Sequence, residues 1–348
     1  MGLFSFNNDN LFLGIDIGDS SLKMVELRKK GQKLYLSNYA FSENIKEINF
    51  TKITQNNYLA QAINKVRTEA GITSEQVIAS LPAFAVFSSI INLSGVDKRE
   101  MSEAINEEAK KIIPLPLEEM VLDWKVVPNK DKSNSGSQKI FLTGSPKKLV
   151  RKYIDIFKKA KLNLVSLETE TFSLVRSLVG DDKSNILIVE IGANSTDLSI
   201  ITNSIPVLNR SLTICSSTVT NVLAKKLNLS YNQAEQFKLD LSVALQEDSK
   251  EELPRLITKT IEPIVTEMKY MIDFYRSQNK GEIEKVVLSG GGSLLLNLSE
   301  YLSKRLNINV VVGDPWNRIS YPKELQPVLK EIGPKLSVAI GLAMREIE

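Results

Sequence analysis

Two segments of the chain, about half its length apart, carry a carboxylate, a glycine and a cluster of hydroxyl or amide side chains in the same order. The first contains Asp16, Gly18, Asp19, Ser20, Ser21 and Lys23, and the second contains Glu190, Gly192, Asn194, Ser195, Thr196 and Asp197. A glycine lets the backbone approach a ligand closely, so successive N–H groups and nearby hydroxyls can surround phosphate oxygens. Carboxylates hold Mg²⁺, usually through water, which makes Asp16 and Glu190 the expected metal residues. Two such turns facing each other would clamp a polyphosphate and its metal.

A third segment offers a surface for a planar base or a phosphate. The apolar residues 286–288 are followed by Gly290, Gly291, Gly292 and Ser293, and then by helical spacing. Glycines before a helix leave its N-terminal backbone uncovered, so a ligand can lie against it. A glycine triplet alone is weak evidence, and each carboxylate–glycine turn alone could equally be an ordinary β-hairpin with a polar turn. Recurrence of the turn in matching strand context favours the phosphate-binding interpretation.

The composition excludes several other kinds of chemistry. The 348 residues include no histidine and one cysteine, which rules out a Ser-His-Asp triad, the usual zinc sites and an internal disulfide. Lys and Arg number 44 against 41 Asp and Glu, with the signs interspersed, so we expect neither nucleic-acid binding nor a polybasic membrane patch. No membrane span or secretion signal is recognisable. We therefore expect a cytosolic protein that reaches a membrane only through a partner.

The first half of the chain predicts an α/β pattern. Alternation predicts antiparallel strands at Leu11 to Ile17, Leu22 to Leu27 and Leu34 to Phe41, before a helix from Asn57 to Ala70. Further strands are expected at Gln76 to Leu81, Ser88 to Leu93, Val121 to Val127 and Lys139 to Thr143, with a polar loop at 129–137. Between them lies a helix with an acidic N-cap at Asp97 and a stop at Pro114 and Pro116. Residues 76–143 are thus expected to form an inserted α+β subdomain.

The second half repeats the opening of the chain. Ile15-Asp16-Ile17-Gly18 aligns with Val189-Glu190-Ile191-Gly192, in each case between two predicted strands. Internal duplication predicts two similarly folded lobes. We expect residues 11–75 and 144–184 in the first lobe and residues 185–348 in the second, where helices predominate up to a last one ending near Arg345.

The order of these motifs resembles a known superfamily. Two phosphate loops, a helix with Ala234, Glu235 and Lys238, and the Gly290 to Ser293 loop follow one another as in the actin, Hsp70 and sugar-kinase ATPases. The insertion, from Glu108 to Glu119 and on to Trp124, is similar to the subdomain shared by the FtsA and PilM families. With Asp314-Pro315-Trp316 near the end, residues 11 to 345 resemble the PilM family, actin-like proteins of type IV pilus assembly.

This resemblance implies an actin/Hsp70-like ATPase fold of two duplicated lobes with an inserted FtsA/PilM-type subdomain. It further implies a cytoplasmic scaffold that binds ATP or ADP with Mg²⁺ between the lobes, supports pilus biogenesis and twitching motility, and contacts other platform proteins and motor ATPases indirectly. A groove at the insertion would receive the N-terminal peptide of the inner-membrane protein PilN, while homodimerisation is left open. The two loops would bind phosphates, Glu235 and Lys238 would reach the ribose or adenine, and Gly290 to Ser293 would carry the adenosine.

Two departures from the family pattern predict slow or absent ATP hydrolysis. Glu190 is one methylene longer than the usual Asp, and a displacement of about 1 Å can matter for catalysis. Cys215 and Ser216 stand where the family tends to have paired glycines, so side chains there could crowd the nucleotide. Any catalysis would rest on Asp16, Glu190 or the weaker candidate Asp197.

Two alternatives are kept. A phosphotransferase of the sugar or acetate kinase branch would need a substrate pocket, but the helical insertions that usually build one are not recognisable. An FtsA-like division adaptor would end in a linker and an amphipathic helix, whereas residues 336–348 are expected to form the last packed helix.

Overall fold

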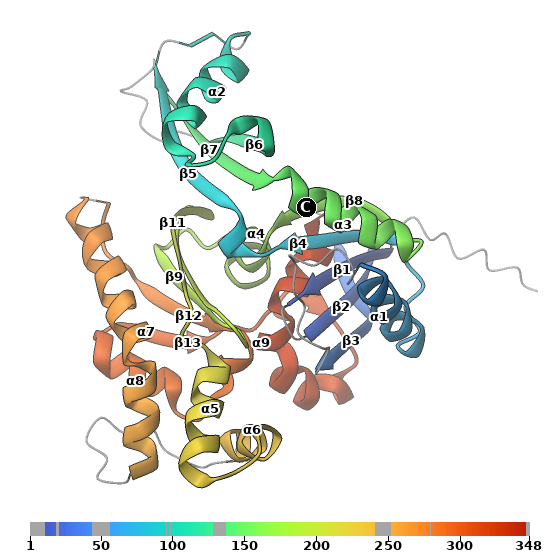
Figure 1. Cartoon of the computed structure of the whole chain (residues 1–348), viewed down its shortest axis with the longest axis vertical. Helices are drawn as coiled ribbons and strands as arrows, with labels where there is room; N and C mark the ends of the chain where they lie inside the picture. The colour runs from blue at the N-terminus through green and yellow to red at the C-terminus, as the bar shows by residue number, and fades with distance from the viewer. Residues whose placement is uncertain are drawn as a thin grey trace, which may run out of the picture.

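The computed structural model describes residues 11–18, 21–43, 56–94, 96–97, 99–127, 137–240, 252–278 and 280–345. The predicted loop positions 129–136 and the site residues Asp19 and Ser20 lie outside these ranges. The described chain forms two lobes, each built on one sheet, and a smaller subdomain that lies at the top of the view in Figure 1. None of its helices is both long and apolar enough to cross a bilayer.

The first lobe contains a six-stranded sheet in the order β14-β3-β2-β1-β4-β8. Its strands are β1 (Leu11–Ile17), β2 (Ser21–Lys30), β3 (Lys33–Glu43), β4 (Gln76–Leu81), β8 (Asn163–Thr169) and β14 (Ile319–Ser320). On one face α1 (Asn56–Glu69) and α3 (Lys147–Lys159) cover an apolar cluster, and on the other face lies α9 (Gln326–Ala343). Because both faces are covered, the central strand β1 is apolar along most of its length.

The inserted subdomain is a three-stranded antiparallel sheet in the order β5-β7-β6 with one helix. Its elements are β5 (Phe87–Ser94), α2 (Met101–Ile112), β6 (Met120–Val127) and β7 (Ser137–Pro146). Met101, Ile105 and Ala109 turn the apolar face of α2 onto this sheet. The expected capping by Asp97 is wrong, since α2 begins after a turn in which Glu100 N–H donates to the Asp97 carbonyl.

The strand Gln76–Leu81 does not belong to the insertion, although its sequence position suggested so. β4 pairs in parallel with β1 and β8, so it is part of the first lobe, and the inserted sheet begins only at Phe87. Strand propensity predicts β4, but its sheet is determined by two distant parallel partners, Leu13 of β1 opposite Val77 and Asn163 of β8 opposite Gln76.

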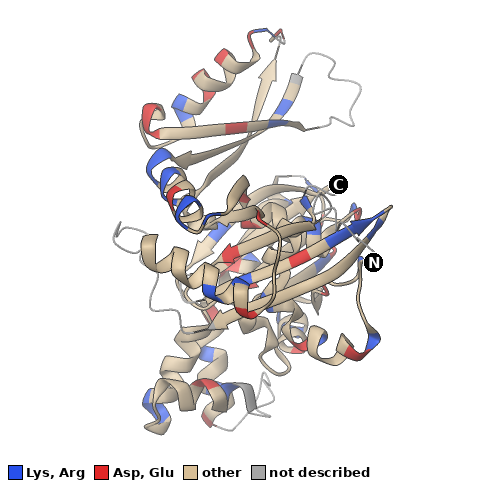
Figure 2. Cartoon of the chain, turned by 90° about the vertical axis from the view of Figure 1, so that its right-hand side faces the viewer, with Lys and Arg blue, Asp and Glu red and all other residues tan. Residues whose placement is uncertain are grey.

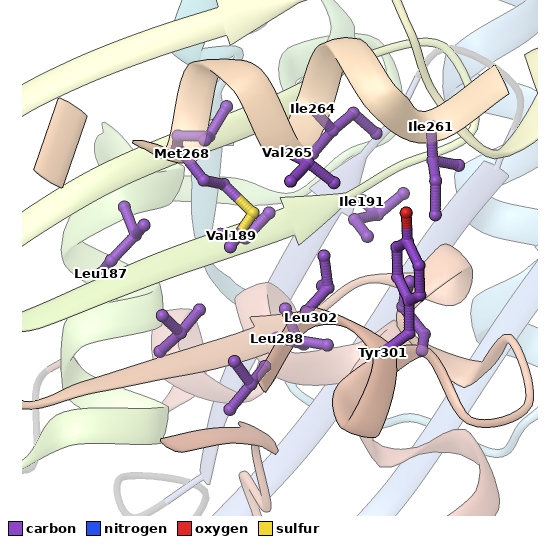
Figure 3. Close-up of a cluster of buried hydrophobic side chains, with 14 of the residues drawn as sticks. Leu187, Val189, Ile191, Ile261, Ile264, Val265, Met268, Leu288, Tyr301 and Leu302 are labelled. Carbon is purple, nitrogen blue, oxygen red and sulfur yellow. The ribbon is translucent and has the colours of Figure 1, made fainter. Parts of the chain in front are cut away.

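The second lobe has a five-stranded sheet in the order β11-β10-β9-β12-β13. Its strands are β9 (Ile186–Ile191), β10 (Thr196–Thr202), β11 (Ile205–Leu212), β12 (Lys285–Ser289) and β13 (Asn309–Val312). The helices are α5 (Ser216–Leu227), α6 (Tyr231–Asp240), α7 (Glu252–Ser277) and α8 (Leu298–Leu306). Figure 3 shows Ile264, Val265 and Met268 of α7 lying over Val189 and Ile191 of β9, which buries the apolar faces of helix and sheet together.

The two lobes repeat one pairing pattern. β1 is antiparallel to β2 and parallel to β4, and β9 is antiparallel to β10 and parallel to β12. Asp16 lies opposite Lys23 in the first hairpin, and Glu190 lies opposite Asp197 in the second. The predicted duplication is therefore present in the strand register itself.

The lobes are joined by α4 (Glu170–Leu174), its π-helical continuation Val175–Val179, and α9. These segments share a core cluster with strands of both sheets, and α9 lies between the lobes in Figure 1. A Cβ at Gly341 would lie 1.9 Å from the Ser173 carbonyl oxygen, so only glycine permits this close crossing of α9 and α4. Residues after 313 were expected in the second lobe, but β14 pairs with β3 and α9 packs on β1 and β2.

Candidate functional site

The first hairpin places a charge pair at the edge of the space between the lobes. Lys23 Nζ donates to Asp16 Oδ2 at 2.8 Å, and Ser80 Oγ donates to Asp16 Oδ1 at 2.9 Å. Gly18 N–H donates to the Ser21 carbonyl at 2.9 Å and closes the turn. A buried carboxylate is therefore held between a cation and a hydroxyl at the point where the chain reverses.

The second hairpin has the same turn. Gly192 N–H donates to the Ser195 carbonyl at 2.9 Å, and Ser195 Oγ donates to Asp197 Oδ2 at 2.8 Å. Thr196 behaves differently from its neighbours, because it is fully buried and does not face the space between the lobes. Of the predicted phosphate-binding residues in this loop, Gly192, Asn194 and Ser195 are the ones that face it.

Both hairpins line one polar cavity, which we call the interlobe cavity. From the first hairpin come Asp16, Gly18, Ser21 and Lys23, and from the second come Glu190, Gly192, Asn194, Ser195 and Asp197. Pro82, Phe84 and Glu170 also line it, together with Ile17 and Ala193 of the two turns. The predicted convergence of the two turns is thus present. Glu170 also accepts a hydrogen bond from Ala83 N–H at 2.9 Å, which ties α4 to the link between β4 and β5.

The carboxylates that line the cavity repel one another. Burial, together with Asp16 and Asp197, raises the pKa of Glu190 to about 8. Burial and the charges of Glu190 and Asp16 raise the pKa of Glu170 well above its ordinary value, and burial raises the pKa of Asp197. Burial alone would lower the pKa of Lys23, but attraction to Asp16 outweighs it and raises that pKa. The cavity therefore favours the arrival of positive charge.

No group of three or more acidic or cysteine side chains among the described residues is arranged to enclose a metal ion. Mg²⁺ does not require such a cage, because it usually keeps several waters and is held by one or two carboxylates together with phosphate oxygens. Asp16 and Glu190, facing the same cavity as two glycine turns, fit that requirement. The donor set is compatible with a hydrated Mg²⁺ that arrives with a polyphosphate.

A second pocket lies in the second lobe and is mainly apolar. Ile191, Cys215, Ser216, Lys238, Gly291 and Gly292 line it, with apolar side chains from α7 and α8. Gly290 anchors the loop by donating its N–H to the Pro334 carbonyl of α9 at 2.9 Å. Gly290 and Ser293 do not face the pocket, and Ser293 is buried with its hydroxyl donating to the Gly290 carbonyl. Only the middle glycines thus present backbone to a ligand.

Lys238 and Glu235 form a bonded group at this second-lobe pocket. Lys238 Nζ donates to Ser216 Oγ at 2.7 Å, to Thr220 Oγ1 at 2.9 Å and to Glu235 Oε2 at 2.8 Å. Burial lowers the pKa of Lys238 although Glu235 partly offsets it. Lys238 lines the pocket, whereas Glu235 does not. Cys215 and Ser216, expected to crowd this region, do line it.

Sequence motifs missed two residues beside these pockets. Glu170 lines the interlobe cavity, but nothing in its local sequence indicates that it meets the two hairpins. Lys335 lies on α9, and a Cβ at Gly291 would be 3.7 Å from its Cγ and Cε. No motif could have found Lys335, since it reaches the loop only through the return of α9.

A groove separates the inserted sheet from the first lobe, and we call it the insertion groove. It is lined by Val121, Trp124 and Lys125 of β6, Val150 of α3, Leu167 of β8 and Phe172 of α4. At one end Glu168 accepts hydrogen bonds from Arg176 at 2.6 and 3.1 Å, and Arg345 Nε lies 3.3 Å from the same carboxylate. Trp124 is 37% exposed, so its indole is available to a ligand in the groove.

The duplicated lobes, the paired hairpin turns and the shared cavity define an actin-like protein. Among solved structures, the ethanolamine utilization protein EutJ from Carboxydothermus hydrogenoformans is 16% identical, with 96% of this chain and 89% of that chain covered and a TM-score of 0.59. MreB 5 of Spiroplasma citri bound to AMPPNP is 12% identical over 97% of this chain and 96% of that chain, with a TM-score of 0.58. These likenesses confirm the expected fold class.

The sequence model described as type IV pilus assembly protein PilM matches residues 14–347. The chain therefore belongs to the PilM family, as its insertion indicated. A solved PilM-PilN type IV pilus biogenesis complex contains a similar chain, 26% identical over 97% of this chain and 98% of that one, with a TM-score of 0.84. This family membership supports the hypothesis of a pilus-assembly protein and not the two alternatives, a phosphotransferase and an FtsA-like division adaptor.

Proposed function

We propose that this protein is an ATP-binding scaffold that docks the N-terminal cytoplasmic peptide of a PilN protein beneath the inner membrane. The observation that carries the proposal is the position of two glutamates where β8 passes into α4. Glu170 lines the interlobe cavity, and Glu168, two residues earlier, lines the insertion groove. One short segment thus borders both a phosphate-type cavity and a peptide-sized groove.

The nucleotide would lie across the interlobe cavity and the second-lobe pocket. The backbone around Gly18 and Gly192 and the hydroxyls of Ser21 and Ser195 would surround the phosphates, with Lys23 supplying positive charge. Asp16 and Glu190 would hold Mg²⁺ through water. Gly291, Gly292 and Lys238 would receive the adenosine. The metal would neutralise phosphate charge and lower the repulsion among the carboxylates.

Hydrolysis by this site would be slow. Glu190, whose pKa is raised to about 8, is mostly protonated at neutral pH and so is a poor metal ligand until the metal itself displaces the proton. Cys215 and Ser216 narrow the pocket where the family tends to have glycine. Glu170 is the carboxyl best placed to orient a water, since it faces the cavity from α4 rather than from either phosphate turn.

The insertion groove suits an extended apolar peptide. Val121, Trp124, Leu167 and Phe172 supply apolar side chains, while Asp123 and Lys125 offer opposite charges at the rim. β6 and β8 are terminal strands of their sheets within the described chain, so each has a free backbone edge. An added peptide strand gains affinity from main-chain hydrogen bonds and specificity from side-chain pockets. Binding the PilN tail there would hold the protein at the cytoplasmic face of the membrane and couple it indirectly to other platform proteins.

Calorimetric titration with a synthetic PilN N-terminal peptide, with and without Mg·ATP, tests the proposal. We expect saturable binding by the natural sequence and a loss of about tenfold or more in affinity for Trp124→Ala, because truncation of a large aromatic contact costs more than 1 kcal/mol. Val126→Ala is the matched control, an apolar side chain of the same strand that is 47% exposed and outside the groove. Absence of peptide binding both with and without nucleotide would refute the scaffold proposal.

A further inference from the structure

The helix α3 and its end concentrate positive charge that the overall composition conceals. Residues 147–161 contain seven Lys or Arg and one acidic residue, in a chain whose net charge is only +3. The seven are Lys147, Lys148, Arg151, Lys152, Lys158, Lys159 and Lys161. In Figure 2 blue predominates on the helix just below the inserted subdomain. The sequence did not indicate a basic patch, because over the whole chain these residues are nearly balanced by acidic residues elsewhere.

Several of these cations have local partners. Lys152 is buried, Lys147 Nζ donates to the Glu118 carbonyl at 2.7 Å, and Lys159 Nζ lies 2.8 Å from Asp155 Oδ2. Hydrogen bonds from Lys159 and Asn56 lower the pKa of Asp155, which stays ionised and compensates one charge. Lys148, Arg151 and Lys158 are exposed, and none of them makes an ion pair with an acidic side chain in the described part of the chain.

The exposed residues share one face. At ~100° per residue, positions 147, 148, 151, 154, 155, 158 and 159 fall within an arc of about 140°. Ile154, 51% exposed, lies at one edge of the same arc, between Arg151 and Lys158 along the helix. The opposite face is buried through Tyr153, Ile156 and Phe157, so α3 is fixed with its basic side outward. A helix with a basic face and an exposed apolar side chain suits the boundary between lipid headgroups and acyl chains.

The basic face also adjoins the insertion groove. Val150 of α3 lines that groove, and Lys147 bonds to the carbonyl of Glu118 in the turn before β6. If the groove holds the tail of a membrane protein, which is the proposed function, α3 lies close to the bilayer from which the tail emerges. The cytoplasmic surface of such a bilayer is negative and attracts clustered Lys and Arg within a Debye length.

We propose that Lys148, Arg151 and Lys158, with Ile154 between them, bind anionic phospholipid headgroups directly. A nucleic acid is the less suitable occupant of this face, because the exposed arc contains no aromatic side chain on which bases could stack. Lipid contact would supplement the peptide and orient the protein against the membrane.

Sedimentation with vesicles tests the inference, using phosphatidylcholine vesicles with and without phosphatidylglycerol at low and physiological salt. We expect binding only to the anionic vesicles, weakened by salt. The triple variant Lys148→Gln, Arg151→Gln, Lys158→Gln should lose roughly a hundredfold in partitioning, at about fivefold per cation. The control Lys304→Gln, Lys323→Gln, Lys330→Gln removes the same charge, from +3 to 0, at exposed sites outside α3 and should bind as the unmodified protein does.

Four outcomes would overturn the inference: no binding to anionic vesicles, equal loss in both triple variants, equal binding to neutral vesicles, or displacement by duplex DNA at equimolar phosphate. Peptide titration of the same variants separates this inference from the proposed function. Loss of vesicle binding with unchanged peptide affinity supports lipid contact by α3. If the protein binds anionic vesicles but does not bind the peptide, the result would support lipid binding by α3 and refute the scaffold proposal.

Discussion

Asp16 and Lys23 lie directly opposite each other in the antiparallel pair of β1 and β2, and their side chains meet at 2.8 Å at the cavity end of the hairpin. The register, rather than the seven-residue spacing alone, makes this contact. The pair gives a buried carboxylate a cationic partner and at the same time presents a cation to the space between the lobes.

Lys23→Ala should weaken ATP binding by about tenfold to a hundredfold, since hydrogen bonds to charged groups contribute roughly 1.5–3 kcal/mol. Calorimetry with Mg·ATP measures the change, and thermal unfolding checks that the fold is retained despite the loss of a partner for Asp16. Lys33→Ala is the control, an exposed lysine at the far end of the neighbouring strand. An unchanged affinity for ATP in Lys23→Ala would mean that the phosphates bind elsewhere.

The raised pKa of Glu190 predicts how the stability of the nucleotide-free protein depends on pH. The folded state keeps a proton up to pH about 8 that the unfolded state releases near its ordinary pKa of 4.5. The folded state therefore binds more protons in this window, and its stability falls as the pH rises from about 4.5 to about 8. Glu170 and Asp197, whose pKa values are also raised, act in the same direction.

Glu190→Gln should flatten this decline and raise Tm by a few degrees at pH 8 but not at pH 4.5. Differential scanning calorimetry across the window measures both effects. Glu300→Gln, an exposed glutamate on α8, should leave the pH dependence as it is. A Tm that rises with pH through this window, or the same slope in Glu190→Gln, would contradict the prediction.

Glu170→Gln should abolish whatever slow phosphate release the protein supports while retaining or strengthening ATP binding. The amide keeps an oxygen that can accept from Ala83 N–H, but it cannot take a proton from water and no longer repels phosphate. Single-turnover phosphate release and calorimetry together measure the two effects. Glu168→Gln, the same change in the insertion groove, should not alter release. If Glu170→Gln releases phosphate at the wild-type rate, Glu170 does not take part in hydrolysis.

Gly290→Ala should destabilise the protein severely and abolish nucleotide binding. Gly290 has φ of +79°, and an added Cβ would lie 2.5 Å from the Ile191 carbonyl oxygen. Gly31→Ala separates the two causes, because Gly31 has φ of +60° but open space around its Cβ. It should cost only the backbone strain, of order 1–2 kcal/mol. If Gly290→Ala and Gly31→Ala lower the free energy of unfolding in urea equally, the close approach to Ile191 does not contribute to the effect at Gly290.

Much of the site could be predicted from sequence because it is local. The hairpins at Asp16 and Glu190 are found by strand alternation interrupted by glycine, and their recurrence indicates that they face each other. Long-range placement could not be derived in this way. β4 joins its sheet between β1 and β8, both distant in sequence, and Lys335 reaches Gly291 only because α9 returns to the first lobe.

Charge was misjudged for a different reason. Acidic and basic residues nearly cancel over the chain, so the basic arc around Arg151 becomes visible only once the helix fixes which side chains face outward. Burial also explains why Thr196 and Ser293 do not face the pockets. Their residue types suit ligand binding, but their side chains lie in the interior.

The position of α9 has a consequence for biosynthesis. Roughly 300 residues separate β1 from α9, so at ~5–20 residues per second the ribosome needs about 15–60 s to make the helix that covers the sheet. Until then Val25 and Leu27 of β2 lack the cover of α9, although they are wholly buried in the finished molecule. The lobe that is translated first is thus completed last, and one face of its sheet lacks its covering helix during that interval.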